Sequence, residues 1–391
     1  MKKITRLILI FLACYSFLDG TAQKYIDTTA IQTDGYDIPI RIKLPKKVTG
    51  KSPVYFFVHG GGWNGGDSKN VPPARLHNDA NYLADQLEVI YVGLAYRCKG
   101  NNATFLDAIE DLEASVQWFF DNAENYNADI TRIGFGGASA GSTLAAIMAQ
   151  KYTNCKLLVG AEGMYNLVKH SEKRSLFPNQ KAREVYGLAT EEESKKASAY
   201  YNLRENPPNT LLLHGDADVL CHYTQSIKFA EKIKSQGGEA KVLLHKDINH
   251  TTLNPSIPDV FKESVLEIAA LFIDGFNLNK NTTSLKALLD KRLKNQYPSS
   301  EINESKLVGS WTRLQTKIVF KNDGNGFLEN LKTKKRHKFN YSFTNDDIKI
   351  DITNSSKVKI FKLKKNTNFI CEHIKEGKRI HRRFLYKKQK S

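Results

Sequence analysis

Three separate segments of the chain carry residue types that together suit acyl transfer through a serine. The first reads GASAG at Gly137–Gly141, directly after the apolar run Ile130–Phe135 and before a helical pattern at Ala140–Gln150. A serine at such a strand-to-helix turn forms a nucleophile elbow, in which the hydroxyl projects and the flanking glycines leave room for neighbouring backbone. The helix that follows directs its N–H groups and positive dipole end toward developing negative charge. We therefore predict Ser139 as a nucleophile.

The second segment supplies a carboxylate. HGDAD at 214–218 follows another apolar run and offers both Asp216 and Asp218. A serine nucleophile needs one acid to hold the imidazole base in the correct tautomer and to stabilise its cation. We choose Asp218, because the acid in loops of this kind lies a few residues beyond the strand end. Asp216 is then expected to organise the loop.

The third segment supplies a base. DINHT at 247–251 follows the apolar run Ala240–Leu244 and presents His250. Alone, a histidine after a strand would be interpreted as a surface residue. The order Ser139, Asp218, His250 along the chain is, however, the order in which the α/β-hydrolase fold presents nucleophile, acid and base.

A glycine-rich segment, HGGGW at 59–63, ends the apolar run before it. Consecutive glycines allow backbone N–H groups to approach an anion closely. We expect the amides of Gly61 and Gly62, together with that of Ala140, to form the oxyanion hole for a tetrahedral acyl intermediate. His59 precedes the nucleophile, against the order of this fold, and is interpreted as a scaffold histidine bonded within its own loop.

These motifs, with YR at 96–97, resemble the secreted esterase branch of the α/β-hydrolases, which includes the hormone-sensitive-lipase-like esterases and the bacterial feruloyl- and acetyl-esterase-like enzymes. The resemblance covers residues 30–275 and implies Ser139 as nucleophile, Asp218 as acid, His250 as base, and Gly61, Gly62 and Ala140 as oxyanion donors. It implies an acyl-enzyme mechanism that needs neither a metal nor an organic cofactor. The chain departs from the common pattern at positions that shape the substrate pocket: Cys98, Leu220-Cys221 and Tyr165-Asn166.

Alternation of apolar runs with helical patterns predicts the fold class of residues 23–278, an α/β domain with a mostly parallel sheet covered on both faces. Strands are expected at Ile38–Leu44, Val54–Val58, Val89–Leu94, Ile130–Phe135, Lys156–Gly160, Thr210–Leu213 and Ala240–Leu244. Helices are expected at Arg75–Gln86, Leu106–Asn122, Ala140–Gln150, Tyr223–Ser235 and Asp259–Gly275. Ligands bind at the carboxyl ends of the strands in such sheets, where each motif above falls.

The remainder of the chain is unlike this domain. Residues 279–305 are rich in Asn, Lys, Ser and Thr and are interpreted as a linker with a short helical patch. Residues 306–391 alternate polar and apolar positions, which predicts a small antiparallel sheet or barrel. Its opening, LVGSW at 307–311, resembles the start of lipocalin-like β-domains.

Charge is distributed very unevenly between the two parts. Residues 1–278 hold 30 Lys and Arg against 31 Asp and Glu, a formal charge of −1, whereas residues 279–391 hold 28 against 10, a charge of +18. The basic clusters include KTKKR at 332–336. One hypothesis is contact with an anionic polysaccharide or a cell surface. The alternative is a solvated, lysine-rich exterior. Without a recognised nucleic-acid motif, and with an export signal, we expect no nucleic-acid partner.

The N-terminus has the pattern of a secretory signal peptide. Three basic residues precede the apolar stretch Leu7–Leu18, and small residues follow it, so we place cleavage after Ala22 and expect a secreted or periplasmic protein. Lipoprotein processing at Cys14 is the second interpretation. No transmembrane span is expected after signal removal. Of Cys98, Cys155, Cys221 and Cys371, a Cys98–Cys221 disulfide is weighed against free buried thiols, which we favour.

The chemistry predicted is therefore a serine carboxylic-ester hydrolase. The segment Asn166–Asn206 is short and polar for a lid, which favours an open site for a bulky carbohydrate ester bearing acetyl or feruloyl groups. A serine peptidase of the same fold is the first alternative. A non-catalytic carbohydrate- or surface-binding protein on the same scaffold is the second.

Overall fold

The computed structural model describes residues 25–168, 186–218, 220–296, 307–313, 316–344, 347–352, 358–363, 369–376 and 379–388. The signal peptide and Cys14 fall outside these residues, as does the middle of the segment interpreted as a lid. Among the described residues, every helix is too short or too polar to cross a membrane.

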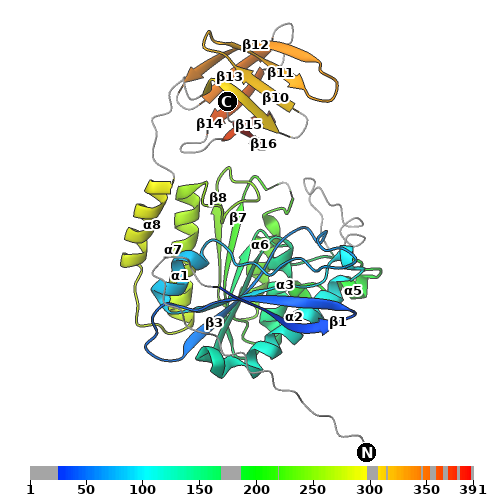
Figure 1. Ribbon diagram of the computed structural model, residues 1–391, viewed down its shortest axis with the longest axis vertical. Coiled ribbons are helices and arrows are strands. Elements are labelled where there is room, and N and C mark those ends of the chain that lie inside the picture. The colour runs from blue at the N-terminus through cyan, green and yellow to red at the C-terminus, as the bar shows by residue number, and fades with distance from the viewer. Residues whose placement is uncertain are drawn as a thin grey trace, which may run out of the picture.

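An eight-stranded sheet forms the centre of the first domain (Figure 1). Its spatial order is β1 (Ile26–Thr33), β2 (Tyr36–Lys43), β4 (Ile90–Leu94), β3 (Ser52–Val58), β5 (Ala128–Ala138), β6 (Cys155–Ala161), β7 (Asn209–Gly215) and β8 (Ala240–His245). β2 is antiparallel to both β1 and β4, and all the other pairs are parallel. The expected mostly parallel sheet is confirmed, with one added edge strand, β1.

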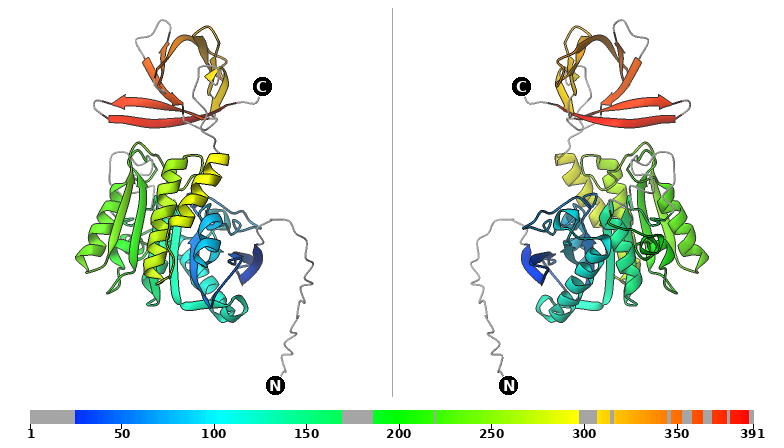
Figure 2. Two further views of the ribbon diagram at one scale, coloured as in Figure 1. Left: turned by 90° about the vertical axis from the view of Figure 1, so that its left-hand side faces the viewer. Right: turned by 90° about the vertical axis from the view of Figure 1, so that its right-hand side faces the viewer.

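Helices cover both faces of this sheet (Figures 1 and 2). Their bounds are α1 (Ala80–Leu87), α2 (Phe105–Asp121), α3 (Ala140–Lys151), α5 (Glu191–Lys196), α6 (Thr224–Ser235), α7 (Pro258–Gly275) and α8 (Thr283–Gln296). The core formed with α2, α3 and α6 lies on one face, and the core formed with α1, α7 and α8 lies on the other. Each strand from β3 to β7 therefore has apolar neighbours on both sides, which explains its nearly continuous apolar sequence.

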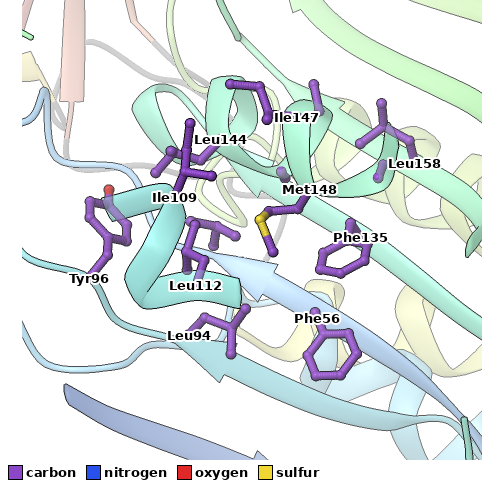
Figure 3. Packing of buried hydrophobic residues seen from close by; sticks show 14 of the residues in the cluster. Phe56, Leu94, Tyr96, Ile109, Leu112, Phe135, Leu144, Ile147, Met148 and Leu158 are labelled. Carbon is purple, nitrogen blue, oxygen red and sulfur yellow. The ribbon is translucent and has the colours of Figure 1, made fainter. Parts of the chain in front are cut away.

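The core under the turn that carries Ser139 is built mainly from aromatic and branched residues (Figure 3). Phe56 of β3 stacks on Phe135 of β5 with ring centroids 5.2 Å apart. α3 packs above them and presents mainly small residues, so the helix lies close to the strands that it covers. α2 begins at a capping box, in which Thr104 and Asp107 satisfy each other's backbone amides. This packing holds the start of α3, and with it Ser139, in place.

The interpretation of residues 279–305 as a linker is wrong for α8. Leu285, Leu289 and Leu293 are 0%, 0% and 4% exposed and belong to the core beside α1 and α7. These three leucines, each four positions apart, form a single narrow apolar stripe on an otherwise polar helix. Three leucines change the average composition of residues 279–305 little, so the many polar residues of this segment favoured its interpretation as a linker.

The C-terminal strands close into an antiparallel barrel, as the alternating pattern indicated (Figure 2). They are β9 (Gly309–Arg313), β10 (Thr316–Phe320), β11 (Asn325–Asn330), β12 (Arg336–Thr344), β13 (Asp347–Ile352), β14 (Val358–Leu363), β15 (Phe369–Glu376) and β16 (Arg379–Lys388). Trp311 is 1% exposed, and its indole N–H donates to the carbonyl oxygen of Leu307 at 2.8 Å. Burial of this ring among the barrel's apolar residues anchors the first strand.

Candidate active site

Ser139 lies at the turn between β5 and α3, in the conformation expected of a nucleophile elbow. Its backbone has φ 56° and ψ −124°, a region that costs free energy and that L-residues rarely adopt. The Ser139 amide donates to the carbonyl oxygen of Ala161 at the end of β6, at 2.8 Å. The flanking glycines are required by contact, since a β-carbon on Gly137 would lie 2.3 Å from the carbonyl oxygen of Gly141. The turn is thus fixed by its neighbours.

The HGGGW loop lies directly against this turn. A β-carbon on Gly60 would be 3.1 Å from the Cβ atom of Ser139. Gly61 and Gly62 adopt φ values of 140° and 63°, which favour glycine. The structure therefore brings the loop beside the serine, while the role of the Gly61, Gly62 and Ala140 amides as oxyanion donors stays a prediction.

His59 belongs to the scaffold of this loop, as expected from its place in the chain. Its Nδ1 lies 2.8 Å from the carbonyl oxygen of Gly60, and its ring stacks on Tyr96 with centroids 4.5 Å apart. The Tyr96 hydroxyl donates to the carbonyl oxygen of His59 at 2.7 Å. Burial lowers the pKa of His59, outweighing its bond to Gly60, so the ring is held neutral at ordinary pH. Tyr96, from the YR pair, thus fixes the start of the glycine loop.

Asp218 and His250 are brought into direct contact at the carboxyl ends of β7 and β8. Nδ1 of His250 lies 2.7 Å from Oδ2 of Asp218. The Asp218 side chain is fully buried, whereas that of His250 remains 16% exposed. The other carboxylate oxygen of Asp218 accepts from the amides of Leu220 and Cys221, at 2.8 and 3.0 Å. The carboxylate is therefore held rigidly, and it orients the ring.

The electrostatics of this pair favour its charged forms. Burial would raise the pKa of Asp218, but hydrogen bonds from His214 and His250 outweigh it and hold the pKa well below its usual range. Burial would lower the pKa of His250, but the bond to Asp218 and the charges of Glu162 and Asp218 outweigh it, and that pKa is raised. The carboxylate is therefore ionised at neutral pH, and the imidazole is a stronger base than a free one.

Asp216 has the structural function expected of it. Its Oδ1 accepts from the amide of Asp247 at 2.6 Å, and its own amide donates to the carbonyl oxygen of His245 at 3.0 Å. It therefore joins the loop after β7 to the loop that carries His250. The structure thus pairs His250 with Asp218, while Asp216 holds the two loops together.

Two polar residues next to this pair were not assigned a role from the sequence. His214, fully buried, has Nε2 3.3 Å from Oδ2 of Asp218 and 2.9 Å from the carbonyl oxygen of Cys221, while its Nδ1 lies 2.7 Å from the hydroxyl of Ser226. Glu162, at the end of β6, is buried and accepts a bond from the amide of Thr252. The only available signal for Glu162 was an acidic residue ending an otherwise apolar run.

Three cysteines of the described residues are free thiols. Cys98, Cys155 and Cys221 are buried and unbridged, which confirms the favoured interpretation over a Cys98–Cys221 disulfide. Burial raises the pKa of Cys98 to about 12 and that of Cys221 well above its usual value, so neither is a nucleophile at neutral pH. In the described part of the expected lid, α5 is a solvated helix that begins at a capping box formed by Thr190 and Glu193.

Comparison with known proteins finds one matching family model and several similar esterases. The family model described as BD-FAE matches residues 40–233, just under half of the chain. Carboxylesterase NlhH of Mycobacterium tuberculosis is 35% identical over 127 residues, 32% of this chain and 38% of its own length. Arylacetamide deacetylase of Bos taurus is 36% identical over 119 residues, 29% of each chain. The chain thus spans well under two thirds of the length of these curated relatives.

Solved structures agree on the fold. Esterase 2 of Thermogutta terrifontis, phosphonylated by sarin, superposes with a TM-score of 0.55 at 19% identity, covering 66% of this chain and 96% of that one. The same esterase with butyrate bound gives a TM-score of 0.52 at 21% identity, covering 64% and 94%. The fold and the turn that carries Ser139 define an α/β-hydrolase. With the family match and the curated relatives, these likenesses support an α/β-hydrolase esterase similar to the hormone-sensitive-lipase-like enzymes, which agrees with that part of the resemblance seen in the sequence.

Proposed function

We propose that this protein is an exported serine carboxylic-ester hydrolase that removes small acyl groups, acetyl or feruloyl, from carbohydrate esters. The observation that carries the proposal is the contact between Nδ1 of His250 and Oδ2 of Asp218, at 2.7 Å. This contact lies at the carboxyl ends of the parallel strands, where the Ser139 turn also lies. The carboxylesterase and deacetylase relatives support acyl transfer as the chemistry. The substrate class rests on the short, polar segment Asn166–Asn206, which favours an open site.

The mechanism follows from the atoms available. The Ser139 hydroxyl attacks the ester carbonyl carbon while His250 takes its proton, and Asp218 stabilises the resulting imidazolium. The amides of Gly61, Gly62 and Ala140 bind the oxyanion. His250 then gives its proton to the leaving alcohol oxygen, and the C–O bond breaks. Water, deprotonated by His250, attacks the acyl-enzyme, and the acid is released as Ser139 regains its proton.

The experiment is release of acetate and ferulate from a panel of esterified polysaccharides, with chromogenic short-acyl esters as a general assay. The proposal is supported if Ser139→Ala lowers ester turnover by at least about 10³-fold. Cleavage of peptides with negligible ester turnover would favour a peptidase. Equal activity of the wild type and Ser139→Ala on every substrate, with sugar binding retained, would identify a binding protein instead.

Export is a separate part of the proposal. We expect removal of residues 1–22, because a basic start, a short apolar stretch and small residues form a signal peptide. Mass spectrometry of the protein recovered from medium or periplasm should find Gln23 as the first residue. A lipid-modified Cys14 at the N-terminus would contradict this cleavage site.

We further propose that the barrel binds an anionic polysaccharide. All seven residues of 332–338, KTKKRHK, are exposed where β11 turns into β12. Such a concentration of charge attracts polyanions, and salt weakens the attraction. Polygalacturonate should be retained at low salt and released at high salt. The triple variant K332Q/K334Q/K335Q should bind several-fold more weakly, whereas K47Q/K156Q/K234Q, which removes three exposed lysines from the catalytic domain, should not. Equal weakening by both variants would contradict a specific surface.

A further inference from the structure

Glu162 is a buried carboxylate at the end of β6 that the proposed mechanism does not use. It is 5% exposed, and its backbone has φ 56°, the left-handed region that a residue with a long side chain adopts only at a cost. A buried charge is also unfavourable unless it is paired or hydrogen-bonded. Two unfavourable features at one residue indicate that surrounding contacts hold it in place.

Those contacts connect three loops of the candidate site. The Glu162 amide donates to the carbonyl oxygen of Leu213 at the end of β7, at 2.9 Å. The residue before it, Ala161, accepts from the amide of Ser139. Its carboxylate accepts from the amide of Thr252, two residues beyond His250. The end of β6 is therefore bonded to the nucleophile turn, to the strand that precedes Asp218 and to the segment that follows His250.

The segment after His250 is also held from its other side. Thr252 is fully buried, and its carbonyl oxygen accepts from the hydroxyl of Ser264 on α7 at 3.3 Å. That hydroxyl lies 2.9 Å from Nε2 of His245. The backbone at Thr252 is thus fixed between the carboxylate of Glu162 and α7.

On this geometry, and resting on the proposed function, we propose that Glu162 is a positioning residue for His250. It fixes the backbone two residues beyond the imidazole, and it places a second buried negative charge near the ring. That charge stabilises the imidazolium formed each time a proton leaves Ser139 or water, which adds to the effect of Asp218.

Other titratable groups surround this point and must be separated from Glu162. Asp218 contacts His250, and His214 contacts Asp218. The charge of Glu162 also acts on Cys221 and on His245, which lies 3.5 Å from Glu263 of α7. The charge of Glu162, like that of Asp218, raises the pKa of His250. Removal of the Glu162 charge alone should therefore lower that pKa.

The test separates the hydrogen bond from the charge. Glu162→Gln keeps a side-chain oxygen for the Thr252 amide and loses the charge, so the acidic limb of kcat/KM should move to lower pH by about 0.5–1. Glu162→Ala loses both, so kcat should fall by a further factor on the order of ten with little change in KM. Glu263→Gln is the matched control, because its carboxylate is 58% exposed and lies 3.5 Å from His245 rather than beside His250. It should leave the limb unchanged.

A second measurement makes the inference independent of ester turnover. NMR titration of the His250 ring in the full-length protein should give a lower pKa in Glu162→Gln than in the wild type. An unchanged pKa in Glu162→Gln, or an equal change in Glu263→Gln, would overturn the inference, even if Glu162→Ala fails to fold. If the pKa falls as expected but the wild type hydrolyses no ester, the proposed function is wrong and the positioning role stands.

Discussion

The backbone of Gly141 lies directly against Val58, because a β-carbon on Gly141 would be 2.1 Å from the carbonyl oxygen of Val58. The same carbon would be 2.4 Å from the carbonyl oxygen of His59. The second glycine of the nucleophile turn therefore allows α3 to approach the strand that leads into the glycine loop. This contact couples the position of Ser139 to the position of the expected oxyanion donors.

Gly141→Ala should therefore be destabilising. The added methyl group meets backbone atoms, which cannot move aside as a flexible side chain can, so the free energy of unfolding should fall by about 1–3 kcal/mol or more. Urea unfolding followed by fluorescence measures this change. Gly50→Ala, at a position with open space around it, is the control and should change the stability by less than about 0.5 kcal/mol. A Gly141→Ala variant as stable as the wild type would contradict the close contact.

Asp218→Asn should lower kcat by a factor on the order of 10⁴, because an amide cannot hold the ring in the reactive tautomer or stabilise its cation. Asp216→Asn is the matched control, since an amide oxygen can still accept from the Asp247 amide. Its kcat should fall by less than about tenfold. Steady-state kinetics on a short-acyl ester distinguish the two. The reverse result would mean that the acid had been assigned to the wrong carboxylate.

As the pH is lowered, kcat/KM of the wild type should begin to fall at a pH above 6.5. His250 acts as a base only when neutral, and its pKa is raised from 6.5, burial being outweighed by its bond to Asp218 and by nearby negative charge. As pH falls through this raised pKa, the imidazole is protonated and kcat/KM declines. A kcat/KM profile from pH 5 to 9, with fluorescence showing a folded protein throughout, tests this. An acidic limb well below pH 6 would contradict it.

The strand-to-helix turn at Ser139 could be predicted from the sequence because its constraints are local. Gly137 and Gly141 flank Ser139 within five residues, and the strand before them is apolar throughout. The alternation of polar and apolar residues also predicted the antiparallel pairing of the barrel. It gives little signal for β11, because the buried positions of that strand include Gly326 and Glu329 rather than large apolar residues.

The residues that sequence reasoning missed depend on contacts between distant positions. The role inferred for Glu162 depends on Thr252, which lies 90 positions later. No local pattern distinguishes such a carboxylate from one that ends a strand in solvent. β1 was missed because it is an edge strand whose residues are mostly exposed or half-buried, so its apolar signal is weak.

α8 gives the remaining prediction, because its leucine stripe makes it part of the catalytic domain. Leu289→Ala should lower the free energy of unfolding of that domain by about 2–4 kcal/mol, since Leu289 is fully buried beside α1 and α7. Lys286→Ala, exposed on the same helix, should change it by less than about 0.5 kcal/mol. Denaturant unfolding of the full chain, monitored by loss of ester turnover and by fluorescence, measures both. If the two variants were equally stable, residues 283–296 would be a linker and not a part of the domain.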